Sequence, residues 1–166
     1  MNLDALNQHI QCNNIESAIK IIEKIGRDRY EEALPLLIEH LETTNNHLLR
    51  NAIALALRDI GSQTAVEPII EVLNNPKTLG YRGTLLYALE PLDYTKHIEL
   101  LIDFIIQGNF EVSRQSLLLI ESISSHISDE TLQKCISKLK QELEILEEKH
   151  ELLSETLELI LESKKE

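Results

Sequence analysis

The sequence predicts an all-α protein, an α-solenoid built from helical hairpins, on three observations. Apolar residues recur at i, i+3, i+4 and i+7 in almost every segment, which is the period of an amphipathic helix. Only 4% of the 166 residues are aromatic and Trp is absent, whereas Leu, Ile, Glu and Ala are abundant. Similar segments also return every 32 residues, and a period of this length is typical of solenoids.

The repeats are clearest between residue 30 and about residue 125. Segments 33–41, 65–73 and 97–105 lie 32 residues apart, and each has the apolar pattern of one amphipathic helix. A second helix follows each of them and begins near an arginine that keeps the same period: Arg50, Arg82 and Arg114. Gly, Asn and Pro between the helices mark turns. Three helical hairpins are therefore expected here.

Both ends of the chain predict further helices. Residues 15–26 have the pattern of a second helix closed by Gly26, and residues 3–10 would supply its first helix. Ser128 is a suitable N-cap for a final segment without Gly or Pro, in which apolar residues are spaced by three and four and are interrupted by His150. We expect two helices that turn near residues 147–150 and cap the solenoid, with one long helix as the alternative.

The chain resembles the HEAT-repeat family in two consecutive runs, LRNAIALALRDIG at 49–61 and AVEPIIEVL at 65–73. The likeness is to the short bacterial kind, also called the HEAT-like or phycobilin-lyase-type repeat. It implies an all-α, right-handed α-solenoid (an α-α superhelix) of HEAT-like helical hairpins with C-terminal capping helices. The expected single domain, 1–166, comprises repeats at about 3–26, 30–61, 64–93 and 95–125 and a cap at 129–163.

The third hairpin and the arginines depart from the family pattern. In Val112-Ser113-Arg114 there is one residue more than in the Val-Arg pair that the family usually shows. The family also tends to place an Asp about six residues before each Arg, and this chain has other residues there: Thr44, Pro76 and Gly108. We expect the arginines to pair internally with Asn45, Asn75 or nearby carboxylates and carbonyls rather than with a ligand.

The charge excludes several classes of partner. The chain has 16 Lys and Arg against 28 Asp and Glu, a formal net charge of −12, so a polyanion such as nucleic acid or an anionic membrane surface would be repelled. No apolar run is long enough to span a membrane. Residues 1–4 are not followed by the apolar run of a signal peptide, and a cytoplasmic protein is expected.

Catalytic and metal-binding patterns are not found in the sequence. The six histidines form no H-x-x-x-H or H-E-x-x-H pattern, and neither G-x-S-x-G nor a Gly-rich phosphate loop occurs. HEAT-repeat deoxyhypusine hydroxylases hold two irons with several His-Glu pairs, whereas this chain has one, His150-Glu151. We therefore expect no enzyme activity, no metal and no cofactor.

A surface for a protein partner is the remaining candidate site. In HEAT hairpins the second helix lines the concave side, and its outward positions form rows at the repeat period. The rows contain Asn51, Leu55, Arg58, Tyr87, Glu90, Gln115 and Leu119. Apolar side chains flanked by Arg and Glu suit a protein interface. In the alternative, neighbouring helices cover Leu55 and Leu119, because a register error of one residue would bury them.

The sequence thus predicts a non-enzymatic protein–protein interaction module, a scaffold or adaptor that binds a protein partner on its concave face. One alternative is a small-molecule-binding or lyase-type accessory protein. Another is a bacterial immunity protein that neutralises a toxin, since a small acidic helical protein could fill the basic groove of a nuclease.

Overall fold

The computed structural model describes residues 2–123 and 127–163, which are helical apart from the connecting turns. Within these ranges no strand occurs, so the prediction of an all-α fold is confirmed. The α-helices are α1 (Leu3–Gln11), α2 (Ile15–Arg27), α3 (Leu34–Thr43), α4 (His47–Ile60), α5 (Val66–Asn74), α6 (Gly83–Leu89), α7 (Ile98–Gln107), α8 (Phe110–Ser122) and α9 (Asp129–Glu162). Short 3-10 turns precede or follow them: η1 (Glu31–Ala33), η2 (Gln63–Ala65), η3 (Pro76–Thr78) and η4 (Thr95–His97).

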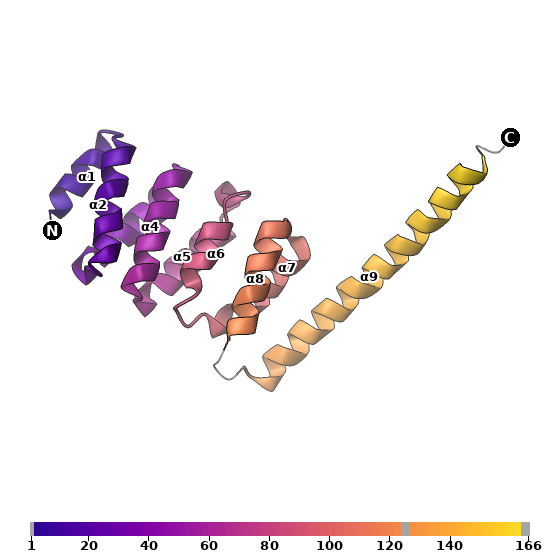
Figure 1. Ribbon diagram of the computed structural model, residues 1–166. Helices are drawn as coiled ribbons and strands as arrows, with labels where there is room; N and C mark the ends of the chain where they lie inside the picture. Colours follow the sequence, from indigo (N-terminus) through magenta and orange to yellow (C-terminus); the bar gives the residue numbers. More distant parts are fainter. Residues whose placement is uncertain (1, 124–126, 164–166) are drawn as a thin grey trace. The chain divides into compact units, whose positions relative to one another are not determined.

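The chain divides into two compact units, Met1–Ser125 and His126–Glu166. Helices α1 to α8 form the first unit as four consecutive hairpins, and α9 belongs to the second (Figure 1). None of the helices in the described ranges is long and apolar enough to cross a membrane. The cap and the handedness of the solenoid stay predictions.

Asparagine side chains fix where three of the second helices begin. Asn14 Oδ1 accepts a hydrogen bond from the Ser17 amide at the start of α2, and Asn46 Oδ1 accepts one from the Leu49 amide at the start of α4. Asn109 does the same for α8, with its Oδ1 atom 2.9 Å from the Val112 amide nitrogen. An N-cap of this kind satisfies an amide that has no partner within the helix, so it sets the first residue of each helix.

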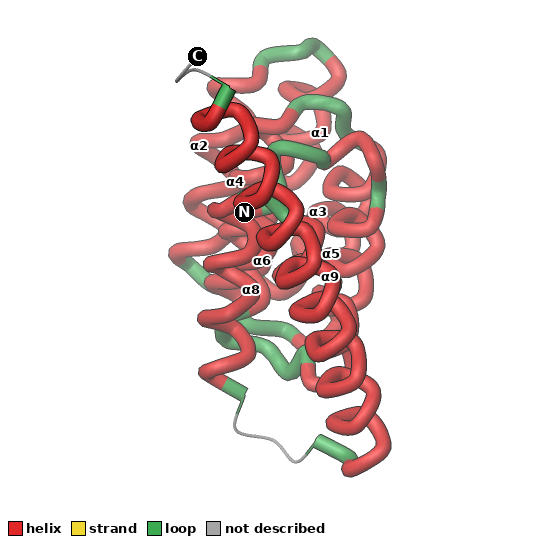
Figure 2. Tube along the Cα trace, turned by 90° about the vertical axis from the view of Figure 1, so that its right-hand side faces the viewer, coloured by secondary structure: helices red, strands yellow, loops and turns green. Residues whose placement is uncertain are grey.

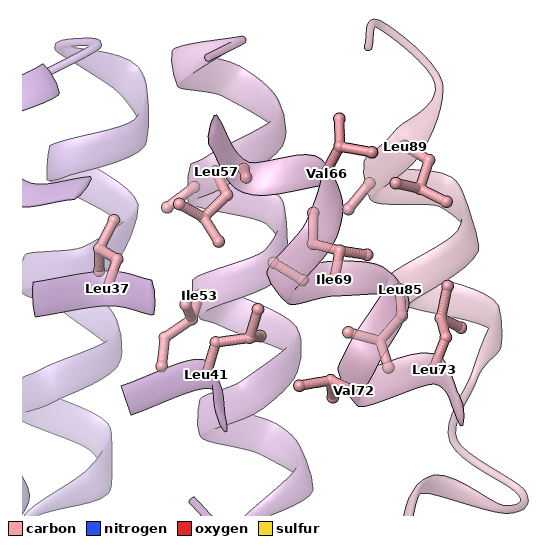
Figure 3. Packing of buried hydrophobic residues seen from close by; sticks show 14 of the residues in the cluster. Leu37, Leu41, Ile53, Leu57, Val66, Ile69, Val72, Leu73, Leu85 and Leu89 are labelled. Carbon is pink, nitrogen blue, oxygen red and sulfur yellow. The ribbon is translucent and has the colours of Figure 1, made fainter. Parts of the chain in front are cut away.

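The eight helices of the first unit pack in two layers (Figure 2). Helices α2, α4, α6 and α8 lie side by side in one layer, here called the second-helix layer, and α3 packs on α5 in the other. Apolar side chains from both layers fill the space between them, as Figure 3 shows for Leu41, Ile53, Ile69 and Leu85. A fully buried Leu or Ile stabilises the fold by about 1.5–3 kcal/mol, so this core holds the hairpins together.

A glycine permits the closest approach in the second-helix layer. A Cβ atom on Gly26 of α2 would lie 3.0 Å from the Ala56 Cα atom of α4, closer than ordinary van der Waals contact. The pairing of α2 with α4 is the most extensive helix contact in the unit. The small residues at this crossing therefore bring the first two hairpins close together.

The C-terminal segment is one helix, so the expected turn near residues 147–150 is wrong. Helix α9 runs without interruption through 34 residues, and Ser128 is its N-cap, as predicted. The polar stretch at 147–151 lies within the helix because Glu, Lys and Leu all favour helix and no Gly or Pro interrupts it. The alternative of one long helix is the correct one.

Candidate functional site

Two of the predicted surface residues lie on the outer face of the second-helix layer. Leu55 on α4 has 38% of its surface exposed, and Tyr87 on α6 has 39%. Both are large apolar residues that a core would bury, and they lie one repeat apart. The alternative in which a neighbouring helix covers Leu55 is therefore wrong.

The third member of this row is Leu118, and the expected outward position of Leu119 is wrong. Leu119 is 1% exposed, whereas Leu118 is 41% exposed. The N-cap of α8, Asn109, lies 63 residues after the N-cap of α4, Asn46, one residue less than two periods of 32. Every position of α8 is therefore one residue earlier than the period predicts. We call Leu55, Tyr87 and Leu118 the partner row.

The same shift changes the other predicted rows on α8. Gln115 is half-buried, and the exposed residue at the corresponding position is Arg114. The counterpart of Arg58 and Glu90 is the exposed Glu121. The extra residue in Val112-Ser113-Arg114 is the sequence signal that could have revealed the shift.

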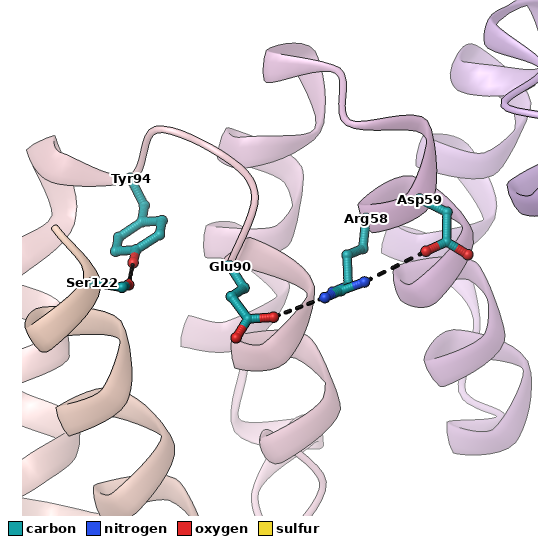
Figure 4. Close-up of polar contacts among 5 residues, drawn as sticks. All are labelled: Arg58, Asp59, Glu90, Tyr94 and Ser122. Atoms are coloured by element: carbon teal, nitrogen blue, oxygen red, sulfur yellow. Dashed lines mark hydrogen bonds and ion pairs between the residues drawn. The ribbon is translucent and has the colours of Figure 1, made fainter. Parts of the chain in front are cut away.

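Arg58 joins α4 to α6 beside the partner row (Figure 4). Its Nη2 atom donates to Glu90 Oε2 at 2.8 Å, and its Nη1 atom lies 3.6 Å from Asp59 Oδ1. The guanidinium carbon is 4.3 Å from the centre of the Tyr87 ring, within cation–π distance. The hydrogen bond to Glu90 raises the pKa of Arg58 above its usual value. The predicted residues Arg58, Tyr87 and Glu90 therefore form one fixed cluster.

A groove of about 600 Å³ lies between α2 and α4, next to Leu55. It is lined by Ile19, Glu23, Arg27, Leu48, Asn51, Ala52, Leu55, Ala56 and Asp59. Asn51, which the sequence predicted, has a buried Oδ1 atom without a hydrogen-bond partner among the described residues. This oxygen leaves an acceptor available for a donor that enters the groove.

The sequence analysis missed the contribution of α2 to this groove. Ile19 and Glu23 lie 32 residues before Asn51 and Leu55, so the rows extend one repeat toward the N-terminus. The periodicity contained this signal, but the first hairpin differs from the others in sequence and was treated only as a terminal repeat. Leu48, 56% exposed, adds a further apolar side chain at the start of α4.

The first two arginines of the 32-residue series have structural positions. Arg50 is 1% exposed, and its Nη2 atom donates to the Thr44 carbonyl at 3.4 Å. Arg82 lies over the Phe104 ring, with its guanidinium carbon 5.0 Å from the ring centre. Burial lowers the pKa of both guanidinium groups. These side chains pack inside the solenoid, as the internal-pairing hypothesis expected.

The third arginine, Arg114, is exposed, and Ser113 occupies the equivalent internal place. The Ser113 hydroxyl lies within hydrogen-bond distance of the carbonyls of Phe104, Ile105 and Gly108 at the end of α7. A hydroxyl that bonds the last carbonyls of α7 ties the two helices of the hairpin together. The one-residue shift of α8 explains why Ser113 has this role.

Histidine and carboxylate groups are dispersed over the unit. His40 Nε2 is 2.7 Å from Asn7 Oδ1, and His97 Nε2 is 3.1 Å from Glu67 Oε1. Among residues 2–123 and 127–163, no three His, Cys, Asp or Glu side chains are grouped so that they could hold a metal ion. The partner row, the Arg58 cluster and the groove are therefore the candidate site.

Comparison with known proteins identifies the repeat. Residues 3–90, just over half of the chain, match the family model for HEAT repeats. No curated protein and no solved structure matches the chain. HEAT repeats commonly mediate protein–protein interactions. The match covers the hairpins α1–α2 and α3–α4 and extends through α6, and the chain therefore belongs to the HEAT-repeat family.

Proposed function

We propose that the protein is a non-enzymatic interaction module, a scaffold or adaptor, that binds a protein partner on the second-helix layer. This is the layer that forms the concave face in HEAT solenoids. The observation that best supports the proposal is the partner row, in which three consecutive helices each expose one large apolar side chain on the same face.

The chemistry of the site suits a protein interface better than a purely polar surface. Tyr and Arg are the residue types most often found at energetic hot spots, and here Tyr87 and Arg58 are in contact. The bond to Glu90 holds Arg58 in place before any partner arrives, so little conformational freedom is lost on binding. The groove between α2 and α4 extends the apolar surface toward the first hairpin.

The partner we propose is a protein, and neither a nucleic acid nor a membrane surface. The formal net charge of −12 disfavours contact with polyanions. A cytoplasmic location is consistent with this role and is part of the proposal.

A capture experiment with matched variants tests the proposal. The full chain, Leu55→Asp and Leu79→Asp are immobilised in equal folded amounts, and retained proteins are identified by mass spectrometry. Leu79 is 71% exposed in the turn between α5 and α6, outside the partner row, so its substitution controls for the added charge. We expect a protein that the unaltered chain and Leu79→Asp retain and Leu55→Asp loses.

Equal retention by both variants would contradict the proposed surface. The same three proteins can also be heated with a library of small metabolites to test the small-molecule alternative. A compound that raises the melting temperature of the unaltered chain and of Leu79→Asp but not of Leu55→Asp would favour a ligand in the groove over a protein partner.

A further inference from the structure

Helix α9 carries a heptad repeat along its whole length. Nine positions are spaced alternately by four and three residues, and eight of them are Leu or Ile: Leu132, Ile136, Leu139, Leu143, Leu146, His150, Leu153, Leu157 and Ile160. We call these nine residues the α9 seam. An apolar repeat of 3.5 residues sustained over four heptads is the pattern of a coiled coil rather than of a helix in a globular core.

The apolar side chains of the C-terminal half of the seam are open to solvent. Leu143, Leu146, Leu153 and Leu157 each expose between 53% and 61% of their surface. Ile160, at the end of the seam, is 53% exposed. A continuous apolar strip of this length on a water-soluble helix indicates a surface that another element covers.

Charge divides α9 into two unlike halves. Residues 129–141 contain three Lys, at 134, 138 and 140, against two acidic residues. Residues 142–162 contain eight Glu and one Lys, a net charge of −7. A parallel pair of such helices would place the two acidic halves side by side. An antiparallel pair would place each lysine-containing half along the acidic half of the other helix.

We propose that α9 forms an antiparallel coiled coil with α9 of a second copy of this chain. The α9 seam supplies the buried apolar contact, and the unequal halves select the antiparallel orientation. In the parallel orientation Glu142 and Glu147 of opposite helices would also occupy facing flanking positions, which adds repulsion. His150 lies near the middle of the seam, where a polar residue restricts the pairing to a limited number of registers.

This pairing would make the molecule bivalent. Because α9 follows α8 in the chain, the two solenoid units of an antiparallel dimer would be attached at opposite ends of the paired helices. A helix of 34 residues is about 50 Å long, so the two units would be separated along the pair. The inference stands independently of the partner row, which belongs to the other unit.

The first experiment measures the mass of the full chain in solution. One chain has a mass of 19.0 kDa, and sedimentation equilibrium should show a species of two chains. The double variant Leu146→Asp/Leu153→Asp places charges within the seam and should sediment as one chain. The control Ile145→Asp/Leu152→Asp changes the preceding residues, which are also apolar and exposed but lie outside the seam, and should remain a dimer.

The second experiment measures the orientation. A spin label is attached to Glu162→Cys in a background in which the two native cysteines are Cys12→Ser and Cys135→Ser. In a parallel dimer the two labels lie beside each other, whereas in an antiparallel dimer they lie about 40 Å apart or more, since each faces the start of the other helix. Pulsed electron paramagnetic resonance separates the two distances.

The proposal is supported by a dimer that the seam variant dissociates, the control variant preserves and a long label distance accompanies. A short distance overturns the antiparallel arrangement. A monomeric full chain at all accessible concentrations overturns self-association, and the seam is then covered by the chain's own solenoid or by a different protein. Far-ultraviolet circular dichroism shows whether each variant keeps its helices. The capture experiment with Leu55→Asp does not depend on these results, so the two proposals can fail separately.

Discussion

His40 of α3 makes the folding of the first hairpins sensitive to pH. Its ring contacts Asn7 of α1, and burial lowers the pKa of His40 below the value of about 6.5 for an unfolded chain. Between the two pKa values the unfolded chain binds more protons than the folded chain. The stability that neutral His40 contributes is therefore complete above pH 6.5 and is lost as the pH falls toward the folded pKa.

We expect the substitution His40→Gln to weaken this pH dependence, because Gln keeps a hydrogen-bonding group and does not titrate. The melting temperature of each protein is measured at pH 7.5 and at pH 5.5. The unaltered chain should lose more on acidification than the variant does. Equal losses would show that His40 is not protonated with a penalty.

The ion pair between Arg58 and Glu90 is expected to contribute little to stability. The Glu90 side chain is 45% exposed, and exposed ion pairs contribute about 0–1 kcal/mol. Glu90→Gln should therefore lower the melting temperature by no more than about 4 °C at low salt, and by less in 0.5 M salt, where charges are screened. A double-mutant cycle with Arg58→Met measures the coupling. A coupling well above 1 kcal/mol would mean that the pair is structural rather than part of a surface.

Single residues also explain where the sequence was sufficient and where it was not. Leu55 and Tyr87 could be placed because α4 and α6 begin exactly one period apart relative to their apolar patterns. Leu118 could not, because the cap at Asn109 shifts α8 by one residue, and on a helix one residue turns a side chain by about 100°. A period of 32 counted along the chain does not detect such a shift, whereas the position of the capping Asn does.

The crossing of α2 and α4 gives a prediction at the scale of the element. Gly26→Ala adds a methyl group 3.0 Å from the α4 backbone at Ala56. Overpacking of this kind costs about 1–3 kcal/mol, which exceeds the gain of up to about 1 kcal/mol when Ala replaces Gly in a helix. We therefore expect a lower free energy of unfolding, measured with urea. Lys24→Ala, exposed on the same helix, should have no comparable effect. A more stable Gly26→Ala protein would contradict the close packing of the two helices.

Helix α9 shows what local polarity fails to predict. The stretch at 147–151 has the composition of a turn, yet the spacing of the seam continues through it from Leu146 to Leu153. A turn would have disturbed the alternation of three and four, and the preserved alternation was the better evidence. What the helix contacts is not encoded in its own pattern, because a heptad seam fits a second copy, another protein or the chain's own solenoid.

The charge of the whole molecule gives a prediction about nucleic acids. With a formal net charge of −12, the chain would have to overcome repulsion from the phosphate backbone. We expect no shift of random duplex DNA at physiological salt in an electrophoretic assay with micromolar protein. Submicromolar, salt-sensitive binding would contradict the proposed class of partner.

The central claim is that the partner row binds a protein, and the affinity of Tyr87→Ala for a partner identified by capture tests it most directly. Tyr87 is 39% exposed and contacts Arg58 from the surface side, so its removal should affect binding far more than folding. Isothermal titration calorimetry should show binding weakened by about 1–3 kcal/mol, the range of an interface anchor, with a melting temperature close to that of the unaltered chain. Unchanged affinity per folded molecule together with a markedly lower melting temperature would contradict the claim and would show that the row belongs to the core.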